Sequence, residues 1–527
     1  MPVQSALDTG WVLTCAALVF LMQAGFCCLE CGAVRAKNSI NVAIKNLVDF
    51  SLSGLLFWGV GFALIFGTSW NGVVGTSWPE LKTPFDYSFF LFQLMFCGAA
   101  TTIVSGAIAE RMRFSAYLIL AALISVVIYP VSAHWVWGSA FTGSTKGWLE
   151  AQGFIDFAGS TVVHAVGGAV GLAACLVIGP RRGRFDDDSS AVYAHNLPLA
   201  TLGVILLWFG WFGFNGGSAL GLTADVPRII TNTVLAGMAG SISALLYSVV
   251  VYRRPDVSIV MNGSLAGLVA ITACCHVVDL PGAACVGLIG GLVATLATAA
   301  LERMKIDDVV GAFPVHTAAG FWGTLCVALF GNPTEWGTGL SQSEQFLIQL
   351  KGATVCTAWA LGSGWLVLAA VNRLVCLRVS AEDEDKGLNI AEHGASSELL
   401  DLMGKMEHQR RTGDFSEPIP MESETEVGQI AAQYNRVLTQ VHNEQSNLLE
   451  ANRQAEETNS RLQVAQSTLR DKLRELREFN EAAVNRELRM VELKEEVNSL
   501  SERVGEDSPY DVSASKSMAT VDGGTEV

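Results

Sequence analysis

Two histidines occupy matching places in two similar stretches of this chain. Both stretches read V-H-x-x-x-G-x-x-G, one beginning at Val163 and the other at Val315. An ionisable side chain inside an apolar segment is costly to bury, so a functional role is the default interpretation. Each neutral imidazole has one donor and one acceptor, so two together can line a narrow path and pass a proton along. The repeat therefore favours a functional pair at His164 and His316 over two independent histidines that only bond to neighbouring carbonyls.

Asp156 begins the segment that carries His164, and two interpretations of it stay open. At a helix N-terminus its carboxylate can cap the backbone. Alternatively, its charge lies near a path for a small cation and lowers the cost of bringing that cation in. Aromatic residues also gather near the outer ends of apolar runs, namely Phe96, Trp135, Trp137, Trp208, Trp211 and Phe214. A tryptophan belt at the membrane interface explains most of them, whereas a cation over a ring face would gain roughly 0.5–2 kcal/mol.

Long apolar runs must hold these residues in place. Half of the residues are apolar, which is too many for a soluble domain of 527 residues. Runs of about 20 residues, the length that crosses a bilayer, lie near 11–29, 48–66, 89–109, 115–137, 160–178, 198–215, 231–252, 258–276, 284–302, 312–330 and 346–372. His164 lies in the fifth run and His316 in the tenth, which cross in opposite directions. The sequence thus predicts an all-α polytopic membrane protein of eleven transmembrane helices with an inverted repeat, whose site lies near the midplane.

Basic residues are concentrated in alternate loops. One set of loops carries Arg35, Lys37, Lys45, Arg111, Arg113, Arg181, Arg182, Arg184, Arg253, Arg254, Arg303, Lys305, Arg373 and Arg378, and the other set only Lys82, Lys146 and Arg228. Basic loops stay on the cytoplasmic side. We therefore expect a multi-pass protein of the inner (plasma) membrane with its N-terminus outside and its C-terminus in the cytoplasm. The first run has no cationic segment before it and is predicted to be a retained span.

The remaining composition argues against several classes of function. All 12 cysteines lie between residues 15 and 376, mostly in apolar runs, where cysteine behaves as a small hydrophobe. Cys27, Cys28 and Cys31 suggest a metal site, but no histidine or second pair lies nearby at ligand spacing, so neither a metal nor a cofactor is predicted. An enzyme is not expected, because no nucleophile–base set stands out. Residues 1–380 have a net charge of -1 and residues 381–527 one of -15, so the tail would repel nucleic acid.

The tail has a different pattern from the membrane part. Apolar or small residues recur every seven positions, at Tyr434, Val441, Leu448, Ala455, Leu462, Leu469, Leu476, Ala483, Met490 and Val497. A second set follows three residues later, as in a coiled coil. We therefore predict a coiled-coil signalling helix at 441–504 and a disordered tail at 505–527, which is rich in Ser, Gly and acidic residues.

Several long motifs resemble the ammonium transporter (Amt/MEP) family. They are Phe-Leu-Met-Gln-Ala-Gly-Phe (20–26), Arg-Ala-Lys-Asn (35–38), Gly-Ala-Ile-Ala-Glu-Arg-Met-Arg-Phe (106–114), Asp-Phe-Ala-Gly-Ser-Thr-Val-Val-His (156–164), Trp-Phe-Gly-Phe-Asn-Gly-Gly-Ser (211–218), Val-His-x-x-x-Gly (315–320) and Gly-Leu-Asn-Ile-Ala-Glu-His-Gly (387–394). The resemblance implies a membrane domain at 1–380, a connector at 381–395 and a homotrimer with one pore per subunit.

The same resemblance implies roles for individual residues. Trp137 and Ser218 would form the outer ammonium recruitment site, with Phe96 as one wall. Phe96 and Phe214 would be the stacked pair that closes the pore mouth, and His164 and His316 the twin histidines. Asp156 would be the acidic residue below the recruitment site. One position departs from the family: several members have Asp five residues before the second histidine, where this chain has Gly311. That difference concerns the cytoplasmic vestibule.

Residues 396–440 resemble a HAMP signalling module. Leu399, Leu402 and Met406 form a short first seam, residues 413–415 a connector, and residues 425–430 the start of a second helix. This arrangement predicts an ammonium sensor that passes ammonium or ammonia occupancy to a separate cytoplasmic signalling protein, with possible transport. The alternative is an ammonium transporter whose tail is a passive oligomerisation stalk.

Overall fold

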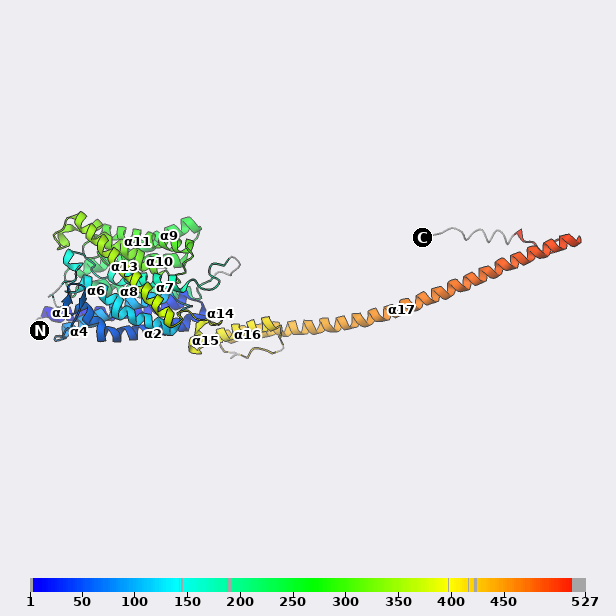
Figure 1. The fold of residues 1–527 in the computed structure, drawn as a ribbon, viewed down its shortest axis with the longest axis horizontal. Helices are drawn as coiled ribbons and strands as arrows, with labels where there is room; N and C mark the ends of the chain where they lie inside the picture. Colours follow the sequence, from blue (N-terminus) through cyan, green and yellow to red (C-terminus); the bar gives the residue numbers. More distant parts are fainter. Residues whose placement is uncertain are drawn as a thin grey trace. The chain divides into compact units, whose positions relative to one another are not determined.

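The chain folds almost entirely into helices. The computed structural model describes residues 3–141, 143, 146–186, 192–396, 398–415, 417–420 and 424–513. The chain divides into two compact units, Met1–Leu400 and Asp401–Val527, and Figure 1 labels their helices where there is room. The predicted all-α fold is confirmed. The last part of the predicted disordered tail, residues 514–527, lies outside the described residues.

The first unit is a bundle of long helices with short interruptions. Its helical elements are α1 (Val3–Ala33), η1 (Ala36–Asn38), α2 (Ser39–Leu56), η2 (Phe57–Gly61), α3 (Phe62–Phe66), α4 (Pro84–Ala107), α5 (Phe114–Leu123), η3 (Ile124–Ile128), α6 (Tyr129–Trp137), η4 (Glu150–Gln152), η5 (Ser160–Ala165), α7 (Val166–Ile178), α8 (Leu197–Gly217), α9 (Val226–Tyr252), α10 (Val257–Ile271), α11 (Leu280–Arg303), η6 (Phe313–Ala318), α12 (Ala319–Phe330), η7 (Pro333–Glu335), α13 (Gln342–Leu374), α14 (Ala381–Lys386) and α15 (Leu388–His393). A small antiparallel hairpin joins β1 (Ser69–Trp70) to β2 (Val74–Gly75).

The predicted spans correspond to apolar helices of this unit. Within the described residues, ten helical segments are long and apolar enough to cross a membrane, and α10 is a shorter apolar helix of 15 residues. Together they account for the eleven predicted runs. α10 ends at Ile271, five residues before the predicted end of its run, and the chain then turns through residues 272–277.

Two of the spans begin with a π-helical turn, and these two spans carry His164 and His316. The turn η5 leads into α7, and η6 leads into α12. The two segments approach each other closely, because a Cβ on Gly320 of α12 would lie 2.3 Å from the carbonyl oxygen of Ser160 in η5. A glycine is needed there for the backbones to meet, as is common where membrane helices cross.

A buried group of ion pairs ties together the loops on the arginine-rich face. The Glu110 carboxylate is fully buried and accepts hydrogen bonds from Arg35 and Arg181. Arg181 also pairs with Asp307 at 2.8 Å. Burial alone would raise the pKa of Glu110, but the neighbouring Arg181 and Arg35 outweigh it and hold this pKa below its ordinary value. The Glu110 carboxylate is therefore charged at neutral pH.

The connector helices α14 and α15 pack against the same face. The Lys37 ammonium donates to the backbone carbonyls of Glu384 and Asp385. The Asn389 side chain accepts a bond from the backbone N–H of Asn41 in α2, at 3.0 Å. Asn41 also bonds to His393 at 3.0 Å. These bonds attach the segment before the tail to η1 and to the first turn of α2.

The second unit contains two helices, α16 (Glu398–Thr412) and α17 (Glu426–Val504). The first three residues of α16 belong to the first unit. A small cluster of Leu402, Ile419 and Ala431 lies between the two helices, each at most 3% exposed. The Asn435 side chain both donates to and accepts from the backbone of Ile419. Thr425 caps α17 by accepting from the N–H of Gly428. Residues 397, 416 and 421–423, which lie in the segment predicted to resemble HAMP, are outside the described residues.

Candidate functional site

Five rings form a continuous column through the first unit, in the order Trp137, Phe96, Phe214, His164 and His316. We call these five residues the ring column. Phe96 of α4 and Phe214 of α8 are stacked with their centroids 4.1 Å apart, and both are at most 1% exposed. The edge-to-face contact of Phe96 with Trp137 spans 6.1 Å. Rings stacked this closely leave no room between them for a hydrated cation.

The two histidines form the other end of the ring column. Their rings lie nearly parallel, at 16°, with centroids 5.3 Å apart, and the two Nδ1 atoms are 3.2 Å apart. His164 and His316 are at most 6% exposed. A hydrogen bond between two Nδ1 atoms requires one ring to donate and the other to accept. The symmetric pair expected from the repeat is therefore brought together.

One ring nitrogen of His164 has no hydrogen-bond partner among the described residues, and its ring packs against an aromatic residue. Its Nε2 atom is buried without a hydrogen-bond partner among the described residues. Its ring stacks on Trp211 at 5.3 Å and 19°, and Trp211 donates to Thr272 at 2.9 Å. Trp211 is fully buried, so the interface-belt explanation is wrong for this residue. Tryptophan suits both a membrane interface and a core, and the sequence pattern does not separate the two.

Asp156 caps the segment that carries His164. Its carboxylate accepts bonds of 2.8–3.0 Å from the backbone N–H groups of Gly159, Thr161 and Val162. This is the capping interpretation raised by the sequence. The backbone carbonyl of Asp156 also accepts a bond of 2.8 Å from the indole N–H of Trp137. Asp156 therefore fixes both the start of the histidine segment and the first ring of the column.

Ser218 joins this arrangement through the backbone of α8. It is the residue that follows α8, and its hydroxyl donates to the carbonyl of Phe214 at 2.9 Å. The residues expected for the site thus lie in one connected set: Trp137 contacts Phe96, Phe96 stacks on Phe214, and Ser218 bonds to Phe214. The set combines one partly exposed aromatic ring, that of Trp137, with a buried imidazole pair.

Comparison with known proteins fits this geometry. The sequence profile of the Ammonium Transporter Family matches residues 10–398. The chain belongs to this family. A relative from Synechocystis sp. is 50% identical over 443 residues, which cover 82% of each chain. The ammonium transporter Amt2 of Archaeoglobus fulgidus is 43% identical over 409 residues, covering 74% of this chain and 87% of Amt2.

A solved structure named "Sensor Amt Protein" has the same fold. It is 41% identical, with a TM-score of 0.72, and the match covers 74% of this chain and 99% of that one. The chain is therefore a multi-pass membrane protein of the ammonium transporter family. Members of this family are transporters and not enzymes. Ammonium as the substrate and a membrane as the environment are consistent with this assignment.

The departure from the family at Gly311 has a structural explanation. Asp308 lies eight residues before His316, as Asp156 lies eight before His164. Its carboxylate accepts from the N–H groups of residues 311, 312 and 313, so it caps the second segment as Asp156 caps the first. Gly311 has φ +79° and its mate Gly159 has φ +108°. Glycine adopts these left-handed values without strain.

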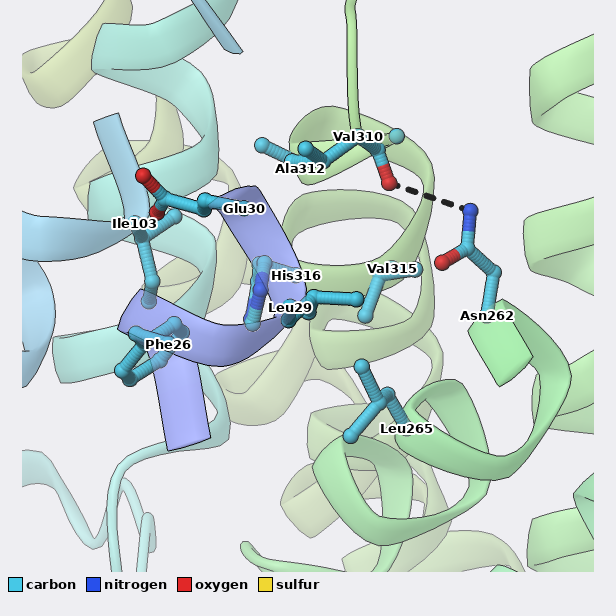
Figure 2. A pocket seen from close by; sticks show the side chains of 11 residues that line it. Phe26, Leu29, Glu30, Ile103, Asn262, Leu265, Val310, Ala312, Val315 and His316 are labelled. Atoms are coloured by element: carbon cyan, nitrogen blue, oxygen red, sulfur yellow. Dashed lines mark hydrogen bonds between the residues drawn. The ribbon is translucent and has the colours of Figure 1, made fainter. Parts of the chain in front are cut away.

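A small cavity lies beside the His316 end of the ring column. Its walls include His316, Phe26, Ile103, Asn262 and Glu30, and Figure 2 shows their side chains around it. Glu30 comes from α1, and no sequence pattern singled it out, because it lies near the end of a long apolar run.

The cysteine cluster of the same helix, α1, forms no disulfide bond. Cys27 and Cys31 have their sulfur atoms 4.0 Å apart, and all 12 cysteines are free. Among the residues that the structure describes, no group of three His, Cys, Asp or Glu side chains is placed to bind a metal ion.

Proposed function

We propose that this member of the ammonium transporter family is an ammonium sensor that signals through its helical tail. The observation that carries the proposal is a complete ring column in the first unit of a chain that also contains α17, a helix of 79 residues. Such a helix is about 120 Å long at 1.5 Å per residue. A protein that only transported ammonium would have no evident need for it.

The ring column supplies the ammonium site in this proposal. Trp137, Ser218 and Phe96 recruit ammonium at the outer end, where a cation over the indole face gains about 1–2 kcal/mol. The stacked Phe96 and Phe214 rings block an intact cation, because burying an unpaired charge between apolar groups costs many kcal/mol. Ammonium can pass as ammonia after losing its proton, which potassium cannot do. The free nitrogen and shared bond of the histidine pair give the proton a place to go.

Asp156 contributes a charge in the same region. Its three backbone bonds stabilise the charged form of the carboxylate. Since Asp156 also holds Trp137 in place, its negative charge offsets part of the cost of bringing a cation to that ring. In this proposal the capping and electrostatic interpretations of Asp156 are compatible.

Features of the tail support signalling. Apolar seam residues of α17 are exposed in the single chain, among them Leu462, Leu469 and Leu476, each at least 57% exposed. A regularly spaced apolar stripe is stabilised by pairing with other helices. The cluster of Leu402, Ile419 and Ala431 resembles the packing expected between the helices of a HAMP-like module. The similar structure named as a sensor supports the same conclusion.

The proposal includes an assembly and an orientation. The protein is a homotrimer, with its N-terminus outside and its tail in the cytoplasm, where the arginine-rich loops also lie. The tail contacts a separate signalling protein. Ammonium favours one of two packings of the tail helices to the extent that it binds one state more tightly.

Distance measurements between tails test the proposal. A genetically encoded spin label at Ser467, outside the apolar seam, avoids labelling the exposed native thiols of Cys285 and Cys376. We expect the interspin distances in liposomes to change on adding ammonium chloride and not on adding potassium chloride. The Trp137→Leu variant should need more ammonium for the same change.

The alternative function is a transporter with a passive stalk. The family assignment supports transport by itself, and polar residues within the seam, such as Lys472 and Arg486, would make a weak stalk. Ammonium uptake by liposomes, with and without residues 396–527, distinguishes the two functions. Robust uptake together with unchanged tail distances would exclude the sensor.

A further inference from the structure

Glu30 of α1 is a buried acid without a counter-ion. Its side chain is 1% exposed, and it accepts a bond of 2.8 Å from the amide of Asn46 in α2. No ion pair to Glu30 is present in the described part of the chain. The nearby Lys45 ammonium is also buried, but it donates to the backbone carbonyl of Met112. A buried carboxylate without a cation is costly, so Glu30 must hold a proton or meet a cation.

The cavity between Glu30 and His316 is the right size for one small molecule. Its volume is about 10 Å³, which is about the space that one water-sized molecule requires. Figure 2 shows Glu30 and His316 among the side chains that line this cavity, together with the apolar side chains of Phe26, Ile103 and Leu265. Water, ammonia and ammonium are all of this size.

An unpaired polar atom lies beside the Glu30 carboxyl group. The Oδ1 atom of Asn46, whose amide nitrogen donates to Glu30, is buried without a hydrogen-bond partner among the described residues. A Cβ on Gly106 would lie 3.1 Å from Glu30 Oε1, so this glycine leaves the carboxyl group its space. Unpaired buried polar atoms are rare in proteins and indicate an unseen partner or a functional role.

Another buried acid nearby shows what a structural carboxyl group looks like. Asp49 of α2 accepts bonds from the hydroxyls of Tyr117 and Thr102. It is not among the residues that line the cavity. Asp49 is therefore held by fixed partners, whereas Glu30 combines one amide bond with access to the cavity.

We propose that Glu30 is the inner proton-carrying group of the ring column. The inference rests on the proposed function, because it requires ammonium to enter the column. At rest Glu30 is a carboxylic acid. When ammonia reaches the cavity, the O–H bond of this acid breaks as a new N–H bond forms, which gives ammonium and the carboxylate. The proton that ammonium lost at the outer end passes to the histidine pair and then, through a molecule in the cavity, from His316 to Glu30, which restores the acid. The cycle consumes no proton and changes no oxidation state.

Glu30→Gln tests this step with little change in shape. The amide oxygen can still accept from Asn46, but the side chain can no longer release a proton. In the full-length protein in liposomes, ammonium-induced infrared difference spectra of the wild type should contain a change in a protonated carboxyl band. That band should be absent in Glu30→Gln and retained in Asp49→Asn. Charge movement after an ammonium pulse should fall by about a hundredfold in Glu30→Gln, as expected for loss of a general acid.

The outcomes separate this inference from the proposed function. Ammonium affinity, measured by calorimetry, should change less than about threefold in Glu30→Gln, since the outer site is intact. Ammonium binding without any carboxyl band, or a band that survives in Glu30→Gln, would overturn the role of Glu30 and leave the sensor intact. Loss of the carboxyl band in both Glu30→Gln and Asp49→Asn would also overturn the role of Glu30. A wild-type protein that binds no ammonium would refute both proposals.

Discussion

The outer ring of the column allows a quantitative prediction. Trp137→Leu removes the aromatic face but keeps an apolar side chain. A desolvated cation–π contact contributes about 1–2 kcal/mol, and 1.4 kcal/mol corresponds to tenfold in affinity. We expect ammonium affinity to fall by about tenfold. Phe96 and Asp156 both contact Trp137, through an edge-to-face ring contact and a hydrogen bond, so the indole plane is fixed before ammonium arrives.

Two further variants make this prediction specific. Trp137→Phe keeps a ring face but loses the bond to Asp156, and it should weaken binding less than Trp137→Leu does. Trp359→Leu is the matched control, because Trp359 also donates its indole N–H to a backbone carbonyl, that of Ile128 at 3.0 Å, but lies outside the ring column. Calorimetric titration with ammonium chloride measures all three. If Trp359→Leu weakened binding as much as Trp137→Leu, the contact would not involve the ring face, and our reasoning would be refuted.

Two other predictions concern the histidines and the ion pairs. His164→Ala or His316→Ala should abolish ammonia or proton movement in liposomes while the protein stays folded; normal ammonium movement with normal selectivity over potassium would make the pair structural. Burial raises the pKa of Asp307, but the hydrogen bonds of Arg181 and the charges of Arg111 and Arg181 outweigh this and lower the pKa to about 2 from 3.8. This lowered pKa contributes about 2 kcal/mol of stability above pH 4, lost as the pH falls towards 2. Thermal unfolding of Asp307→Asn should lack that contribution; an unchanged pH profile would contradict it.

The membrane part of the fold was predictable because it depends on composition. A run of about 20 apolar residues must form a helix in a bilayer, where every backbone polar group needs an internal partner. The exact ends of helices depend on local packing. The run at 258–276 shows this, because the helix stops at Ile271 and His276 then stacks on Phe157 with centroids 4.2 Å apart. Nothing in the hydropathy of the run indicates that stop.

The candidate site was only partly predictable for a related reason. His164 and His316 were found because a repeat marked them, and their pairing in space follows from that symmetry. Trp211 and Glu30 do not belong to a repeat that would indicate their role. Trp211 supports His164 from another helix, and the partner of Glu30 is Asn46 on the next helix. Contacts of this kind depend on how helices cross, which a single sequence does not specify.

Helix α2 links the inner cavity beside the ring column to the segment that precedes the tail. Near its start, Asn41 bonds to Asn389 and His393 of α15. Five residues later, or about 7.5 Å along the helix, Asn46 bonds to Glu30 at the inner cavity. A helix moves as a rigid element over this distance, so a change in the bond between Glu30 and Asn46 bears directly on α15. α13 leads to the connector along the chain, but of the two helices it is α2 that bonds to both the acid and the connector. A sensor of this architecture would therefore respond to the protonation of Glu30 as well as to the occupancy of Trp137.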